Sequence, residues 1–253
     1  MKIAIITGAS SGLGREFALC TAKMYDNIDE IWLVARRRDR LEKLASEIKG
    51  VNCRAVEMDL CAEGSIAELE KMIKESGADI RLLINNAGMG KLGNISDMSV
   101  ESQTAMVDLN IRALTAVTTL SLKYMSRGAE IVNVCSIASF APNARLTVYS
   151  STKAYVLSFT KGLREELKPL GINCCCVCPG PMRTEFLAVA NITEGASKTF
   201  DTLPYCNAAT VAKKTLTASK KGRCVYTPTP FYKFYRLIAK LLPHSVVMKM
   251  SRA

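Results

Sequence analysis

The stretch Ile3-Ala4-Ile5-Ile6-Thr7-Gly8-Ala9-Ser10-Ser11-Gly12-Leu13-Gly14 joins a short apolar run to a glycine-rich turn. The apolar run predicts a strand, and a helical pattern begins at about residue 12. Glycines at this junction permit a tight turn and the close approach of a pyrophosphate, which the helix N-terminus attracts. The strand–turn–helix context favours a dinucleotide site over a plain surface turn. The residues assigned to it are Gly8, Ser10, Ser11, Gly12, Leu13 and Gly14.

Strand and helix patterns alternate along the rest of the chain, which predicts βαβ units and a parallel sheet. A length of 253 residues, 49% of them hydrophobic, suits a single doubly wound α/β domain of Rossmann type with about seven strands. The expected strands lie at about 3–7, 30–35, 53–58, 80–85, 130–136, 172–178 and 223–227. The expected helices lie at about 12–25, 39–49, 64–76, 99–127, 147–168 and 207–219.

Two further segments lie outside this alternation. The stretch 179–206 lacks clear periodicity, and a loop of that length is typical of a lid over a ligand. We therefore assign residues 1–228 to the dinucleotide-binding and catalytic domain, with this substrate loop inside it. Residues 229–253 form a basic amphipathic extension. Because the chain contains no apolar run of about 18 residues, we expect no transmembrane helix.

The ten cysteines bear on the cellular compartment and on metal binding. Because no export signal is recognised, they indicate a reducing, cytoplasmic compartment. The run Cys174-Cys175-Cys176-Val177-Cys178 invites a metal interpretation. Alternation along a strand sends adjacent cysteines to opposite faces, and the only histidine is the distant His244. We therefore expect buried cysteines that act as small hydrophobic residues, and no metal.

Charge is concentrated at the C-terminus. The net charge is +11, yet all 23 acidic residues lie at or before Asp201 and the last 52 residues contain ten Lys or Arg. Residues 230–242 predict a helix that ends before Pro243, with Lys233, Arg236 and Lys240 away from its apolar stripe. We expect the stripe to pack on the body or a sister subunit. The alternatives are an anionic membrane surface, an acidic acyl carrier or coenzyme A. Because no binding module accompanies the charge, nucleic acid is not expected.

The end of the second predicted strand bears on cofactor choice. A site for NAD places an acid there to hold the ribose 2′-hydroxyl, but this chain has Ala35 followed by three arginines. Guanidinium groups suit a 2′-phosphate through bidentate hydrogen bonds and stacking. We therefore predict NADP, held by Arg36 and Arg37. Asp59-Leu60, after the third strand, is assigned to the adenine edge.

Tyr149-Ser-Ser-Thr-Lys153 places a phenol and an ammonium one helical turn apart on the same face. A free tyrosine, with a pKa near ~10, is a poor acid or base at neutral pH. A neighbouring lysine stabilises the phenolate and lowers that pKa. Ser136 lies thirteen residues upstream, and Asn86-Ala87-Gly88 follows a strand. Together these residues predict carbonyl/alcohol redox chemistry with a nicotinamide cofactor.

With these motifs in order, the chain resembles the short-chain dehydrogenase/reductase family over about residues 3–190. Two stretches, 33–37 and 157–167, resemble the NADP-preferring, DltE-like branch of that family. The motifs that carry the resemblance are Thr7-Gly8-x3-Gly12-x-Gly14, Asn85-Asn86-Ala87-Gly88, Asn110, Ser136, Tyr149-x3-Lys153 and Pro179-Gly180-x3-Thr184.

The resemblance implies a role for each of these positions. Tyr149 is the general acid in reduction and the base in oxidation, and Lys153 lowers its pKa and holds the nicotinamide ribose. Ser136 hydrogen-bonds the substrate oxygen. Asn110 binds a water that links Lys153 to solvent. The resemblance also implies a homodimer or homotetramer. The cofactor set is completed by Asn86, Ala87, Gly88, Pro179, Gly180 and Thr184.

The segments expected to line the substrate pocket are largely apolar. They span 89–96, 137–148 and 182–205, and they predict a hydrophobic ketone or aldehyde such as a steroid-like or fatty-acyl compound. One rival is a nucleotide-sugar epimerase or dehydratase, which the short chain and the glycine spacing disfavour. The other is a redox sensor or interaction protein that binds NADPH without turnover, which the complete catalytic set disfavours. The expected wall residues are Met89, Leu92, Phe140, Leu146, Val148, Met182, Phe186 and Leu187.

Overall fold

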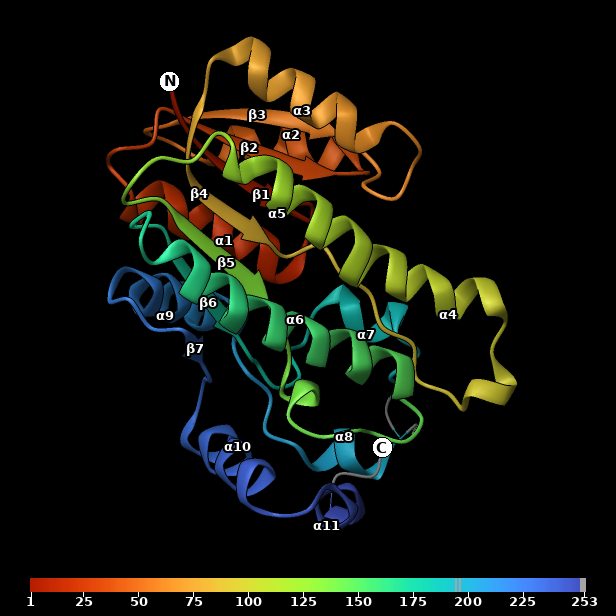
Figure 1. Ribbon diagram of the computed structural model, residues 1–253. Helices are drawn as coiled ribbons and strands as arrows, with labels where there is room; N and C mark the ends of the chain where they lie inside the picture. The colour runs from red at the N-terminus through yellow and green to blue at the C-terminus, as the bar shows by residue number, and fades with distance from the viewer. Residues whose placement is uncertain (194, 196, 251–253) are drawn as a thin grey trace.

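The computed structural model describes residues 1–193, 195 and 197–250. Seven parallel strands form one sheet in the order β3-β2-β1-β4-β5-β6-β7, which confirms the predicted doubly wound α/β fold (Figure 1). The order reverses between β1 and β4, and ligands of such sheets bind beyond the strand ends at this point. The strands are β1 Lys2–Thr7, β2 Glu30–Ala35, β3 Asn52–Glu57, β4 Asp79–Asn85, β5 Glu130–Val134, β6 Asn173–Val177 and β7 Val225–Tyr226.

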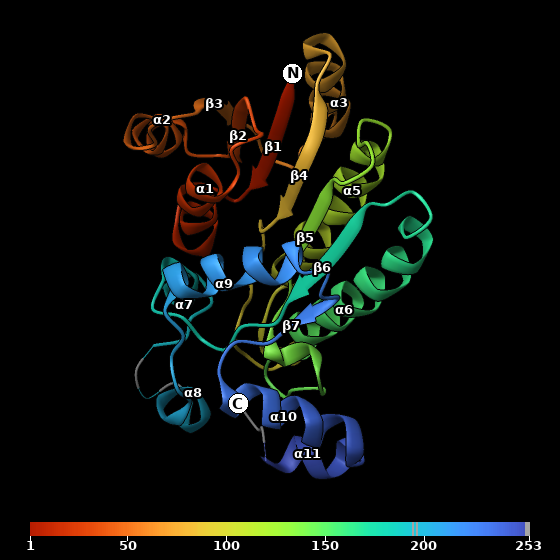
Figure 2. The same cartoon turned by 90° about the vertical axis from the view of Figure 1, so that its left-hand side faces the viewer.

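Helices cover both faces of the sheet (Figure 2). Because side chains alternate along a strand, β1 supplies both cores: Ile6 packs with Phe17 on one face, and Ile5 packs with Val117 on the other. Parallel strands buried on both faces therefore explain the near-continuous apolar runs in the sequence. One face carries α1 Gly12–Met24, α2 Arg38–Glu47 and α9 Ala208–Lys220; the other carries α3 Ser65–Ser76, α5 Leu114–Leu122 and α6 Thr147–Leu167.

The single helix predicted over 99–127 is divided into three parts. Helix α4 (Val100–Val107) passes into a π-helical segment, Asp108–Ala113, and then into α5, which ends at Leu122. Such π segments are frequent at functional sites, and this one carries Asn110.

The predicted loop 179–206 contains two short helices, α7 (Glu185–Val189) and α8 (Lys198–Thr202). They lie beyond the carboxyl ends of the strands (Figure 1). Residues 194 and 196 of this loop fall outside the described residues. Short 3₁₀ helices, Ile95–Asp97 and Ile137–Ser139, follow β4 and β5.

The C-terminal extension forms two helices at the same end of the molecule, α10 (Pro230–Leu241) and the unpredicted α11 (His244–Met250) (Figures 1 and 2). Residues 251–253 of the extension lie outside the described part of the chain. The buried Tyr232 holds α10 to the body, and its hydroxyl donates to the Pro204 carbonyl oxygen at 2.6 Å. A Cβ on Gly180 would lie 2.1 Å from the Tyr232 ring, so glycine is required at that contact.

The apolar stripe predicted for α10 packs only partly on the body. Tyr235 and Ile238 pack with Phe140 and Ala141, beside a buried face formed by Tyr232 and Ala239. The other stripe residues are exposed, as is Leu237, and packing on a sister subunit stays a prediction; the exposed stripe residues are Phe231, Phe234, Leu241 and Leu242. Within the described residues, no helix combines the length and apolarity needed to cross a bilayer.

Substitution of Gly14 tests the packing of the glycine turn. A Cβ there would lie 2.2 Å from the Gly8 carbonyl oxygen, so Gly14→Ala should lower the free energy of unfolding by about 1–3 kcal/mol. Gly162→Ala, in an open position of α6, should raise it by about 0.5–1 kcal/mol because alanine favours helix. Urea unfolding of the two variants measures both values. Changes of the same sign would contradict the predicted clash.

Candidate active site

One cavity of about 760 Å³ brings together residues that are far apart in the sequence. It is lined by the segments that follow β1 to β6 and by part of α10. Of the predicted site residues, Gly14 and Asn110 stand behind its wall. Those that line it are Gly8, Ser10, Ser11, Gly12, Leu13, Arg36, Arg37, Asp59, Leu60, Asn86, Ala87, Gly88, Ser136, Tyr149, Lys153, Pro179, Gly180 and Thr184.

The glycine turn is fixed by hydrogen bonds from the segment after β4. Gly8 and Gly12 have positive φ angles of 66° and 54°, which glycine adopts without strain. The Asn86 Nδ2 donates to the Thr7 and Gly8 carbonyl oxygens at 3.0 and 3.1 Å. The Thr7 hydroxyl accepts from the Asn86 and Ala87 amides at 3.0 Å each. The Asn86-Ala87-Gly88 motif therefore holds the turn in shape while lining the cavity.

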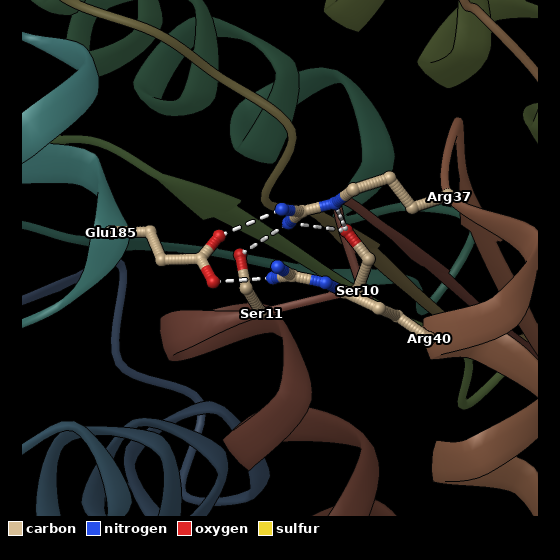
Figure 3. Close-up of polar contacts among 5 residues, drawn as sticks. All are labelled: Ser10, Ser11, Arg37, Arg40 and Glu185. Atoms are coloured by element: carbon tan, nitrogen blue, oxygen red, sulfur yellow. Dashed lines mark hydrogen bonds and ion pairs between the residues drawn. The ribbon is translucent and has the colours of Figure 1, made fainter.

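A cluster of arginine and serine side chains lies at one end of the cavity. Figure 3 shows the contacts within this cluster. Arg37 donates to the Ser10 hydroxyl at 3.0 and 3.3 Å and to the Ser11 hydroxyl at 3.0 Å. Ser11 is the N-cap residue of α1, whose first N–H groups have no partner within the helix. Guanidinium, hydroxyl and helix N-terminus are the donors that suit a phosphate, so these residues fit the predicted NADP.

Glu185 of α7 also contacts this cluster (Figure 3). One carboxylate oxygen accepts from Arg37 at 2.8 Å and the other pairs with Arg40. Hydrogen bonds from the two arginines lower the pKa of Glu185. Sequence reasoning missed both Arg40 and Glu185. Arg40 lies in the first turn of α2, three residues after the N-cap residue Arg37, which is a detectable spacing. The position of Glu185 in the loop 179–206 gives no comparable pattern in the sequence.

The residues predicted for the adenine edge, Asp59 and Leu60, line the cavity together with Arg36, which was predicted to hold the 2′-phosphate. The exposed Arg36 lies with its Nη1 3.8 Å from an Asp59 carboxylate oxygen. The other Asp59 oxygen accepts from the Cys61 amide at 2.9 Å, which holds the carboxylate at the cavity edge.

The predicted catalytic groups converge at the other end of the cavity. Tyr149 and Lys153 lie on α6 and are buried, while Ser136 caps the 3₁₀ helix that follows β5. The Ser136 side chain hydrogen-bonds the Tyr149 phenol. Lys153 donates from Nζ to the Val134 carbonyl oxygen at 2.9 Å, and this nitrogen lies 5.8 Å from the centroid of the Tyr149 ring.

Burial has the largest effect on both titratable groups. It raises the pKa of Tyr149, although the Ser136 hydrogen bond acts in the opposite direction. Burial also lowers the pKa of Lys153. The lysine was expected to lower the Tyr149 pKa, but in this structure that pKa is raised, chiefly by burial. Tyr149 is therefore a protonated phenol at neutral pH, the form that donates a proton.

Asn110 is buried behind the cavity and fastens the segment after β4. Its Nδ2 donates to the Met89 carbonyl oxygen at 2.8 Å and to the Thr152 hydroxyl at 3.0 Å, and its Oδ1 accepts from the Met89 amide at 2.9 Å. A Cβ on Gly88 would lie 3.0 Å from this Oδ1 and 3.4 Å from the Lys153 Nζ. Asn110 and Lys153 thus flank the same glycine.

Three buried cysteines meet beneath the predicted catalytic residues. Cys174 and Cys175 point into opposite cores, as alternation predicts. Cys176 and Cys178 share one face with Cys135, and the three Sγ atoms lie within 4.8 Å of one another. The cysteine run alone does not indicate this cluster, because Cys135 follows the neighbouring strand β5. Burial raises the pKa of Cys176 and Cys178, as expected for thiols in an apolar setting.

The pocket wall near Tyr149 is mainly apolar. Of the predicted wall residues, Met89, Leu146, Met182, Phe186 and Leu187 line the cavity. Leu92, Phe140 and Val148 pack behind it instead. The predicted wall segment 182–205 also contributes Val189, Ala190, Ile192, Thr199, Phe200 and Leu203. Helix α10 contributes Phe231, Tyr232 and Tyr235, which were not predicted to line the pocket.

Comparison with known proteins identifies the family. The family model described as short chain dehydrogenase matches residues 2–195. An uncharacterized oxidoreductase of Staphylococcus aureus is 30% identical over 195 residues, covering 76% of this chain and 83% of the relative. The chain therefore belongs to the short-chain dehydrogenase family, which confirms the oxidoreductase class.

Two solved structures are similar in both sequence and fold. A short-chain dehydrogenase from Sphingobium yanoikuyae, in complex with NADPH, is 31% identical with a TM-score of 0.81, over 95% of this chain and 92% of that one. A bulky-bulky ketone specific alcohol dehydrogenase from Comamonas testosteroni is 28% identical with a TM-score of 0.77, over 100% of this chain and 95% of that one.

Proposed function

We propose that this protein is an NADP-dependent oxidoreductase of the DltE-like branch that interconverts a carbonyl and a secondary alcohol on a hydrophobic substrate. One observation carries the proposal. A single cavity has the Arg37, Ser10 and Ser11 cluster at one end and the Ser136, Tyr149 and Lys153 groups at the other. A nucleotide that spans the cavity links these two ends.

The preference for NADP rests on the charge at the end of β2. Ala35 stands where an acid would hold a ribose 2′-hydroxyl, and Arg37 already binds two hydroxyls beside the α1 N-terminus. The Sphingobium relative, which was solved with NADPH, supports the same choice. The bound cofactor supplies or accepts a hydride at the substrate carbon. Asn86, Ala87, Gly88, Pro179, Gly180 and Thr184 are assigned to its nicotinamide half.

The protein's own residues manage the proton and the charge on the substrate oxygen. Tyr149 donates its phenolic proton to that oxygen in reduction and accepts it in oxidation. The Ser136 hydroxyl hydrogen-bonds the same oxygen and stabilises negative charge as it develops. Lys153 lies close enough to favour the phenolate that remains after the transfer.

Proton resupply is assigned to Lys153 and Asn110. One acceptor position of the Asn110 Oδ1 is taken by the Met89 amide, and a carbonyl oxygen has a second. Because Asn110 and Lys153 flank Gly88, a water held at that second position would connect the lysine to solvent.

The apolar wall supports a hydrophobic substrate. Leu146, Met182, Phe186 and Leu187 surround the approach to Tyr149, and the Comamonas relative is described as specific for bulky ketones. We therefore assign a steroid-like or fatty-acyl ketone as the substrate class.

The deciding experiment measures oxidation of NADPH and NADH by absorbance at 340 nm with a panel of ketones. Faster turnover of bulky apolar ketones than of small polar ketones, with NADPH preferred, is the expected result. Preference for small polar ketones would contradict the substrate class, and preference for NADH would contradict the cofactor. Tight NADPH binding without turnover of any compound would favour the sensor alternative.

Three further assignments complete the proposal. Residues 1–228 form the catalytic unit and 229–253 an addition that closes part of the cavity through Tyr232 and Tyr235. All ten cysteines lie in the described part of the chain as free thiols, which supports a reducing cytoplasmic compartment. The family resemblance supports a homodimer or homotetramer.

A further inference from the structure

Helix α10 carries an apolar face that the body of the protein leaves uncovered. Phe231, Phe234, Leu237 and Leu241 are 52%, 63%, 52% and 69% exposed. Their spacing of three, three and four residues places them on one stripe of the helix. Tyr232 holds a different face of α10 to the body and is completely buried. The exposed stripe is therefore presented outward by a helix that is firmly attached.

Positive charge lies beside this stripe. Lys233, Arg236 and Lys240 are spaced by three and four residues, between the exposed stripe and the buried face. Lys233 and Lys240 are exposed, and Arg236 lies over the Phe140 ring. No acidic residue follows Asp201, so nothing in the last part of the chain neutralises these charges.

Helix α11 extends the same surface. Val246 and Met248 are exposed, and Lys249 adds a further charge. Val247 is buried against Ala239 and Ala141, which ties α11 to α10. The two helices lie together beyond the carboxyl ends of the strands (Figure 2).

We propose that this surface binds a membrane that contains anionic lipid. We define the C-terminal docking face as Phe231, Phe234, Leu237 and Leu241 with Lys233 and Lys240. An exposed stripe of large apolar residues flanked by lysines is the composition of helices that lie in the bilayer interface. Anionic headgroups attract the lysines while the phenylalanine and leucine side chains enter the acyl boundary.

The charge argues against a second copy of the chain as the occupant. A twofold contact through this face would bring together the exposed Lys233 and Lys240 of both copies, and the last 52 residues contain no acid to pair with them. Such like charges repel across an interface. An anionic lipid surface supplies the opposite charge and an apolar interior together.

The position of the docking face suits delivery of an apolar substrate. Phe231, Tyr232 and Tyr235 of α10 line the cavity that contains Tyr149. The idea that the substrate enters from the membrane rests on the proposed function, because it assumes a hydrophobic substrate. A ketone dissolved in the bilayer would then enter the cavity beside α10 without crossing open water.

Vesicle sedimentation with the full chain tests membrane binding without any assay of turnover. Wild type should sediment with vesicles of phosphatidylcholine and phosphatidylserine, and much less with phosphatidylcholine alone. Phe234→Glu combined with Leu241→Glu should reduce binding at least about tenfold. Leu170→Glu, at a 57% exposed leucine on another surface, is the matched control and should bind like wild type.

A second pair of variants tests whether the lysines of the docking face contribute to membrane binding. Lys233→Glu combined with Lys240→Glu should reduce binding to the anionic vesicles about tenfold, and added salt should release the wild type. Lys161→Glu combined with Lys168→Glu, at exposed lysines in α6 and at its C-cap, makes the same charge change elsewhere and should have little effect. Circular dichroism and NADPH binding confirm that each variant is folded.

Several results would overturn the proposal. One is failure of the wild type to sediment with vesicles of either composition. A second is unchanged binding by the Phe234→Glu, Leu241→Glu variant. A third is a wild-type dimer that only this variant dissociates, which would assign the face to a second copy. Vesicle binding by a protein that reduces no ketone would refute the proposed function alone.

Discussion

Replacing Tyr149 with phenylalanine is expected to reduce kcat for ketone reduction by about 10²–10⁴-fold while NADPH binding changes little. The phenolic oxygen is the only part of the side chain that is removed, and it is the group that Ser136 contacts. The ring packing against Phe186, with centroids 5.7 Å apart, is retained, so the cavity should keep its shape. Steady-state kinetics and NADPH titration by fluorescence separate the loss of chemistry from a loss of binding.

Tyr155→Phe provides the matched control for this variant. Tyr155 lies on the same helix, but its hydroxyl bonds to the Thr115 hydroxyl at 2.9 Å on the outer surface. Removal of that oxygen should leave kcat unchanged within about twofold, as for surface substitutions away from a site. If the two variants lost activity equally, the effect would come from α6 rather than from a proton transfer at Tyr149.

The pKa of Tyr149 also determines how the rates of reduction and oxidation change with pH. Burial raises the Tyr149 pKa, so the phenol is protonated at neutral pH. Reduction needs the protonated phenol and should slow as the pH rises through that pKa. Oxidation needs the phenolate and should become faster over the same range. Rate profiles in both directions check the sign, and two profiles that move together would exclude Tyr149 as the shared acid and base.

The strands were predictable because parallel strands buried on both faces leave a continuous apolar run in the sequence. Each of the seven lies within two residues of its expected position. Gly8, Asn86 and Thr184 line one cavity because every βα turn of such a sheet opens at the same end. The order of the motifs along the sequence was therefore enough to predict most of the residues that line the candidate site.

Features that depend on tertiary packing were not predictable. Asn110 lies in a π-helical turn and its side chain binds the Met89 backbone, a tertiary contact that no helical pattern reveals. Glu185 lies 148 residues after Arg37, and the two meet only through the tertiary fold. The apolar stripe of α10 has the same sequence pattern whether it faces the core or solvent. Tyr232, against Gly180, sets which face is buried.

Arg37→Ala should weaken NADPH binding about 10- to 100-fold and change NADH binding little. The reason is the loss of charge-assisted hydrogen bonds to the 2′-phosphate, worth about 1.5–3 kcal/mol. Arg37 already donates to Ser10 and Ser11, so its guanidinium is held at the anion-binding end of the cavity. Arg38→Ala is the control, because exposed Arg38 pairs with Glu42 on the outer side of α2.

Glu185→Gln should strengthen NADPH binding, whereas Arg37→Ala should weaken it. The Glu185 carboxylate contacts Arg37 and Arg40 where the 2′-phosphate is expected, so it competes with that phosphate for both arginines. Because these ion pairs are about half exposed, its removal should tighten NADPH binding only about two- to fivefold. NADH has no 2′-phosphate and should bind as before. Weaker NADPH binding by this variant would mean that Glu185 acts mainly to close the lid over the cofactor.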